Sequence, residues 1–143
     1  MYGIWPARGR GELTLAGAIL YACEGTKLRR DTRGKNTFYY AVEFTNANPI
    51  LARIFMRFLR EILEVDLRRI KGQIFFYPDH NEEKLRKFWS FETGIPTQQF
   101  QKSIPLEAKN PRYRPNPNGV LKIRTQDKET FLRLQCIIET VVR

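Results

Sequence analysis

Glu24 is the residue whose position raises the first chemical question. It is the one acid in the apolar segment TLAGAILYACEGTK, residues 14–27, and Gly25 follows it. The segment has the pattern of a helix, and a carboxylate at the carboxyl end of a helix costs about 0.3–1 kcal/mol because the helix dipole is negative there. Glu24 is therefore either an ordinary exposed residue at the end of a core helix or an acid that a partner stabilises.

The other residue types that often do chemistry give weaker signals. The single histidine, His80, follows Asp79 at the expected start of a helix and has no Cys or His neighbour at ligand spacing, so we expect a loop or capping residue. Cys23 and Cys136 both lie in apolar helical patterns. This placement favours reduced, buried side chains over a disulfide or a metal site.

Polar side chains alternate with apolar ones in several predicted strands, which is the two-residue period of a half-buried sheet. With helices covering one face, the polar set would lie on the other. That set comprises Arg29, Tyr39, Glu43, Arg69, Lys71, Gln73, Lys122 and Arg124. A cationic sheet face with amide groups suits a DNA groove, because Lys and Arg contact phosphates while Gln and Arg recognise base edges. A solvated polar face is the alternative.

The elements that must position these residues follow from the hydrophobic pattern. Helices are predicted over residues 12–24, 48–65, 79–94 and 127–143. Residues 27–46 predict a β-hairpin whose turn covers residues 33–36, and further strands are predicted within residues 68–78 and 119–126. Residues 95–119, which contain five prolines, predict an extended loop with a short strand near FQKSIP.

Capping and spacing predict where these helices end and which side they bury. Gly25 and Gly94 are placed to end helices, and Asn48 followed by a proline is placed to begin one. Asp79 and Glu82 have the spacing of a capping box. In the second helix, the buried stripe is predicted at Ile50, Ile54, Phe58 and Ile62. The predicted class is α+β, with a mostly antiparallel sheet covered by helices on one face and an extra helix and loop before the last strand.

Length and charge limit the class of protein. A chain of 143 residues suits one domain, expected over residues 12–143 after a flexible basic leader at 1–11. Lys and Arg outnumber Asp and Glu by 25 to 15, and a net charge of +10 favours a polyanionic partner such as nucleic acid. No apolar run approaches the roughly 20 residues of a membrane span, and no secretory signal is evident, so we expect no membrane partner and a cytoplasmic location.

The order of elements and the segment GAILYACEG together resemble a single-motif member of the LAGLIDADG homing endonucleases. Residues 17–25 align with the nine motif residues so that the catalytic acid falls on Glu24 and the final glycine on Gly25, with Ala18 at a like position. The segments VEFTNANPILARIFMRFL and LKIRTQDKETFLRLQCIIE resemble the family's second strand with its following helix and its last strand and helix. The resemblance covers residues 12–77 and 118–142. The sequence departs from the motif at Ile19 and Ala22, where the motif has glycine and aspartate.

The resemblance implies an αββαββα fold with a saddle-shaped sheet and a homodimer formed through helix 12–24. Ala18, Tyr21 and Ala22 would lie at the subunit contact. Glu24, with Gly25 beside it, would bind Mg²⁺ at the centre of the dimer, where the metal contacts scissile phosphates and activates water. One carboxylate per subunit, doubled by symmetry, satisfies a cation that often takes only one or two carboxylates. The implied activity is Mg²⁺-dependent cleavage of double-stranded DNA at a pseudo-palindromic site.

Further roles carry over by position. Asn46 falls where the family often has a polar residue that orders water, and Arg124 with Lys122 falls near the family's basic residue beside the scissile phosphate. A turn residue and simple phosphate contacts are the alternatives. The hairpin would contact DNA through Lys27, Arg29, Arg30, Arg33 and Lys35, unless its tip is only solvated.

Two other functions fit the same sequence. A non-catalytic DNA-binding regulator would explain why the motif aspartate is replaced by Ala22. An RNA-binding intron maturase is the third possibility, although the sequence contains no RRM or KH signature.

Overall fold

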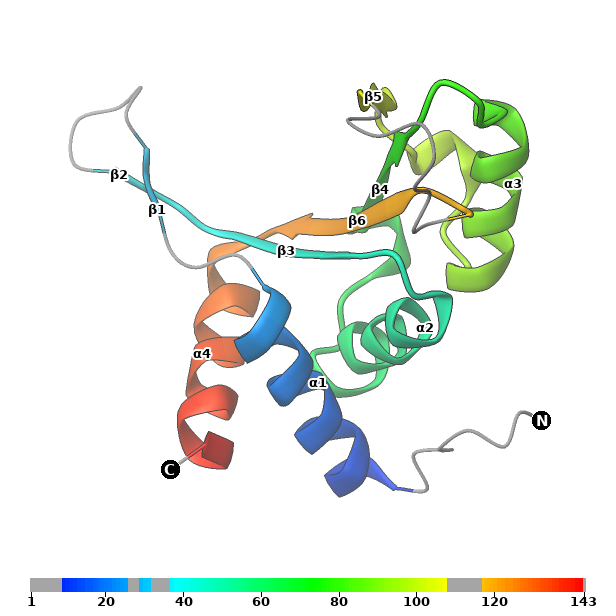
Figure 1. Cartoon of the computed structure of the whole chain (residues 1–143). Coiled ribbons are helices and arrows are strands. Elements are labelled where there is room, and N and C mark those ends of the chain that lie inside the picture. The colour runs from blue at the N-terminus through cyan, green and yellow to red at the C-terminus, as the bar shows by residue number, and fades with distance from the viewer. Residues whose placement is uncertain (1–8, 26–28, 32–36, 108–116, 143) are drawn as a thin grey trace.

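The computed structural model describes residues 9–25, 29–31, 37–107 and 117–142, and it has an α+β architecture of a mixed open sheet and four α-helices (Figure 1). The helices are α1 (Arg10–Glu24), α2 (Pro49–Arg57), α3 (Glu82–Thr93) and α4 (Lys128–Val142). The strands are β1 (Arg29–Asp31), β2 (Thr37–Tyr39), β3 (Ala41–Asn46), β4 (Lys71–Phe76), β5 (Ile104–Pro105) and β6 (Val120–Gln126). A π-helical turn, η1 (Phe58–Ile62), and two 3-10 turns, η2 (Leu67–Arg69) and η3 (Thr97–Gln99), complete the described elements.

The four-stranded sheet has the order β3-β6-β4-β5. The β3–β6 and β6–β4 pairs are antiparallel, as predicted, whereas the short β5 runs parallel to β4. Strands β1 and β2 form a separate antiparallel hairpin that leads directly into β3 (Figure 1). In the same view α1, α2 and α4 lie on one side of β3 and β6, as predicted, and α3 lies at the β4 end of the sheet.

The core lies between this sheet face and the helices. Alternate strand residues point into it: Val42 and Phe44 from β3, and Leu121 and Ile123 from β6, are all almost fully buried. The ring of Phe44 stacks on Phe55 of α2 with centroids 4.5 Å apart. The two-residue period therefore assigned both strands to the correct faces.

Helix α2 begins as predicted and ends differently. Asn48 caps it by accepting a hydrogen bond from the Ile50 N–H at 2.9 Å. The helix widens into a π turn at Phe58, and its buried face is centred on Ala52, Phe55, Met56 and Leu59. The predicted stripe is therefore wrong at Ile50, which is 37% exposed. Phe58 and Ile62, which lie in the π turn, are buried as predicted.

Helix α3 belongs to the segment inserted between β4 and β6. Its cap is Asn81, whose side chain accepts from the Lys84 N–H, so the capping box predicted at Asp79 is wrong. Gly94 ends the helix in the left-handed region, at φ 80°. His80 is a turn residue, as predicted, because its Nδ1 accepts the Tyr77 N–H at 3.1 Å.

Two further sequence predictions about helices are wrong. Helix α1 begins at Arg10, within the segment that we expected to be a leader, although residues 1–8 of that leader lie outside the described residues. Cys23 and Cys136 are both exposed free thiols, not buried ones. An apolar helical pattern alone does not show which of its residues face the core.

Candidate nucleic-acid interface

The side of β3, β6 and β4 that faces away from the helices, here called the open sheet face, carries most of the predicted polar set. Strand register brings its residues into rows across three strands. One row is Glu43, Arg124 and Lys71, and the next is Thr45, Lys122 and Gln73. Sequence alternation alone predicted that these residues share a face, and the register confirms it.

Glu43 differs from its neighbours because it is only 4% exposed. Its carboxylate pairs with the Arg124 guanidinium at 3.3 Å, and its N–H donates to the Tyr21 hydroxyl at 3.3 Å. A direct contact between Glu43 and DNA, which the sequence predicted, is therefore wrong for this structure. Its observed role is to orient Arg124, whose side chain is about a quarter exposed.

The other residues of the face are held by specific contacts. The Lys122 ammonium lies 5.5 Å from the centroid of the Phe75 ring, a cation–π geometry. The Gln73 amide donates to the Lys102 carbonyl at 2.9 Å, so its oxygen remains available as an acceptor. Fixed side chains lose less conformational entropy when they bind a ligand.

Arg69 extends the face beyond β4, from the 3-10 turn η2 and not from a strand. Its guanidinium pairs with Asp127 at 3.3 Å. Hydrogen bonds from the side chain and backbone N–H of Thr130, with a smaller contribution from Arg69, lower the pKa of Asp127 below its ordinary value. Asp127 is thus the N-cap of α4 and also an anchor for Arg69.

Glu24 lies at the exposed carboxyl end of α1, beside the edge of the sheet. The Gly25 N–H donates to the Tyr21 carbonyl at 2.8 Å, and Gly25 forms an isolated antiparallel bridge with Phe44 of β3. The bridge brings Glu24 next to the end of β3 that carries Asn46. Nothing in the described ranges forms an ion pair or hydrogen bond with its carboxylate, and no cluster of three metal-ligating side chains was found in them.

The expected dimer contacts on α1 need correction. Ala18 and Tyr21 are 0% exposed and face the core of their own chain, so neither can contact a second helix. Ala22 is half-buried, and its place in a contact stays a prediction. The apolar residues that α1 does expose are Leu15 and Ile19, each at 47%. Neither was predicted, although their i, i+4 spacing on the motif helix was a signal.

Asn46 is a turn residue in the structure, which was the alternative to an active-site role. Its Oδ1 accepts the Asn48 N–H at 2.8 Å, which makes it the turn residue that joins β3 to α2. In the hairpin, Arg29 pairs with Tyr39 and Arg30 with Phe38. The remaining predicted hairpin contacts, Lys27, Arg33 and Lys35, lie outside the described residues.

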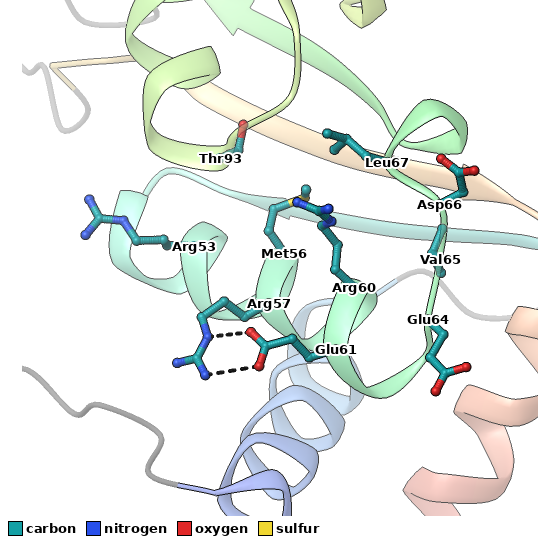
Figure 2. A pocket seen from close by; sticks show the side chains of 10 residues that line it. All are labelled: Arg53, Met56, Arg57, Arg60, Glu61, Glu64, Val65, Asp66, Leu67 and Thr93. Carbon is teal, nitrogen blue, oxygen red and sulfur yellow. Dashed lines mark hydrogen bonds and ion pairs between the residues drawn. The ribbon is translucent and has the colours of Figure 1, made fainter.

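A second group of arginines, on the helical side, lies in a pocket that is lined by acids as well. This pocket, of about 600 Å³, is lined by α2, η1, η2 and the end of α3, and Figure 2 shows its side chains. Arg57 pairs with Glu61 at 2.8 Å, which lowers the pKa of Glu61, and Arg53 pairs with Glu92. Because three acids, Glu61, Glu64 and Asp66, line this pocket beside three arginines, it has no preference for an anion.

The open sheet face also has a pocket, at its corner beyond β4. This corner pocket, of about 310 Å³, is lined by Arg69, Lys71, Gln101, Arg124, Thr125 and Gln126. Three of these residues, Gln101, Thr125 and Gln126, were not among the candidates that the sequence suggested. Thr125 lies on the apolar side of the alternation in β6, so the pattern gave no signal for it. Gln126 could have been found, since it continues the alternation of Lys122 and Arg124. Gln101 could not, because its place depends on how the inserted segment folds.

Comparisons of the chain with protein-family models, with curated proteins and with solved structures find no match. No helix in the part of the chain that the structure describes is long and apolar enough to cross a membrane. The functional argument therefore rests on the sequence and on the geometry of the open sheet face.

Proposed function

We propose that the chain is a DNA-binding protein of the LAGLIDADG homing-endonuclease type, which acts as a homodimer and cuts double-stranded DNA with Mg²⁺. The observation that carries the proposal is a cationic sheet face with a carboxylate-bearing helix end beside it. Lys71, Lys122 and Arg124 lie in neighbouring strands of that face, and the end of α1 is bridged to the edge strand β3. Element order supports the proposal too, since a helix, a hairpin that continues into β3, a helix, two strands and a helix remain when the insertion is set aside.

The donor set fits Mg²⁺. Glu24 offers an exposed carboxylate that no described cation neutralises, and oxygen is the ligand that Mg²⁺ prefers. Two copies of this carboxylate would repel each other across a two-fold axis, and a divalent cation relieves that repulsion. When bound, the metal would supply Lewis-acid stabilisation of a phosphate and a more acidic water.

The dimer that the proposal needs would use the exposed side of α1. Leu15 and Ile19 lie one helical turn apart, and Cys23 continues the same row towards Glu24. Contact of this row with its symmetry mate would bring the two α1 helices together. Symmetry would then place both Glu24 carboxylates at one end of the contact.

The test begins with selection of a binding site, because the target sequence is unknown. Purified protein is used to select duplexes from a random pool, and the selected duplex is incubated with Mg²⁺ or with EDTA. Wild-type protein is expected to bind under both conditions and to cut only with Mg²⁺. Glu24→Gln should bind the duplex normally and cut it at least 100-fold more slowly than wild type. The control Glu83→Gln replaces an exposed acid on α3, and it should bind and cut the duplex as wild type does.

Each other outcome has a defined meaning. Failure to select any duplex refutes DNA binding and with it the proposal. Tight, salt-sensitive binding without Mg²⁺-dependent cutting would refute the nuclease and leave a DNA-binding regulator, for which Ala22 at the motif's aspartate position already argues. Undiminished cutting by Glu24→Gln would refute the role given to Glu24.

A further inference from the structure

The corner pocket is built partly from the inserted segment, which the family resemblance leaves unmatched. Hydrogen bonds fix that segment along the outer edge of β4. The Gln101 N–H donates to the Gly72 carbonyl at 2.7 Å, and the Leu106 N–H donates to the Phe76 carbonyl at 2.7 Å. The Gln99 side chain adds two donations of 2.8 Å, to the carbonyls of residues 67 and 70. The insertion is therefore a firmly held wall of the pocket.

Close packing supports the same conclusion. Gly72 lies under the ring of Phe100, and a Cβ at Gly72 would come within 3.0 Å of that ring. The Gln73 amide reaches across to the Lys102 carbonyl. Backbone, side-chain and ring contacts thus hold Gln101 at a defined place beside Lys71.

The lining of the corner pocket has the composition of an anion site. It combines three cations with the amides of two glutamines, and no acid lines it. The acids that pair with Arg69 and Arg124, namely Asp127 and Glu43, lie outside the lining. Lys71 is exposed, and no acid in the described part of the chain pairs with it.

We propose that the corner pocket binds a phosphate group between Lys71, Arg69 and Arg124, with the Gln101 amide as an additional donor. Phosphate suits the lining because it carries negative charge on several acceptor oxygens, which Lys and Arg neutralise and amide N–H groups can also contact. The phosphate would be one of the DNA backbone, so the inserted segment takes part in the recognition of DNA. To this extent the inference rests on the proposed function, although a free phosphorylated molecule has the same chemistry.

Two measurements on the full chain test the proposal. In the first, pyrophosphate is titrated into ¹⁵N-labelled protein, and backbone amide shifts are followed at Lys71, Gln101 and Gln126. We expect saturable shifts at these positions, weakened at least fivefold by Lys71→Ala and left unchanged by Lys84→Ala, which removes an exposed cation from α3.

In the second measurement, affinity for the selected duplex is recorded against salt concentration. Lys71→Ala is expected to lower the slope of log K against log salt by about one, because one phosphate contact is lost. Gln101→Ala should weaken binding without changing the slope, and Lys84→Ala should change neither. The Tm of each variant is compared with that of wild type, and an unchanged Tm shows that the substitution has not damaged the fold.

The outcomes separate this proposal from the proposed function. If duplex binds but Lys71→Ala leaves both the slope and the pyrophosphate response unchanged, the pocket is not a phosphate site, whereas DNA binding stands. If pyrophosphate binds and no duplex does, the pocket takes a free phosphorylated molecule and the proposed function fails. If neither ligand binds, both proposals are overturned.

Discussion

Gly17 gives the sharpest test of how α1 packs. It lies on the buried side of the helix, and a Cβ built there would overlap the Cγ and Cδ atoms of the Phe58 ring, far closer than real Cβ contacts allow. Phe58 is 0% exposed, and its ring packs against that of Phe55 with centroids 5.8 Å apart. The ring has little room to yield, so Gly17→Ala should overpack this part of the core.

The expected size of the effect follows from two opposing contributions. Overpacking a tight core typically costs about 1–3 kcal/mol, and this site belongs near the upper end because the ring is fully buried. Alanine in place of glycine within a helix returns about 1 kcal/mol through its better helix propensity. We therefore expect Gly17→Ala to lower the free energy of unfolding by about 2 kcal/mol. In a domain of this size that corresponds to a fall in Tm of about 8 °C.

Urea unfolding followed by tryptophan fluorescence measures the loss. Gly11→Ala in the same helix is the matched control, since its Cβ would meet no atom within 4 Å, and it should be neutral or slightly stabilising. The double variant Gly17→Ala, Phe58→Leu should cost less than the sum of the single changes, because the smaller side chain makes room. A Gly17→Ala protein as stable as wild type would refute this packing. A loss that depends on protein concentration would instead indicate that Gly17 belongs to a subunit contact.

Two further predictions concern the dimer and the cap of α4. Ile19→Glu should weaken self-association at least 100-fold in sedimentation velocity, whereas Leu132→Glu, at a similarly exposed position of α4, should leave it unchanged; equal effects would refute a contact through α1. Asp127→Ala removes an N-cap and should cost about 1 kcal/mol at pH 7. Because the folded pKa of Asp127 is lowered, its stabilisation is present above the ordinary value of about 3.9 and disappears as the pH falls through the lowered pKa. Urea unfolding at a series of pH values from 7 downwards should therefore show the difference between the variant and wild type shrinking in acid, and a constant difference would contradict this assignment.

The parts of the fold that depend on local pattern could be predicted. Alternation in β6 assigned Leu121 and Ile123 to the core and Lys122 and Arg124 to the open face, because a strand has an almost invariant two-residue period. The N-cap at Asn48 could likewise be predicted, because a capping side chain accepts a hydrogen bond only from N–H groups in the first turn of its own helix. Such features require no knowledge of distant residues.

Features that depend on distant partners were missed or misjudged. Alternation placed Glu43 on the correct face, but its burial and its pairing with Arg124 depend on a strand some 80 residues later in the sequence. The stripe predicted for the helix from Asn48 was wrong at Ile50, and the ring of Phe58 packs against Gly17 of another helix. In the candidate site, the position of Gln101 depended on how a long insertion docks on β4. No local pattern contains that information.

The strand pairing of the insertion also protects the sheet from association. Without it, β4 would present an unpaired edge that includes Phe75 and Phe76, a template on which a strand of another molecule could assemble. The strand of the insertion that pairs with this edge, β5, is only two residues long and ends at Pro105, which has no N–H to offer a further strand. Removal of residues 78–117 is therefore expected to yield a chain that aggregates edge to edge, and not a smaller soluble version of the same domain.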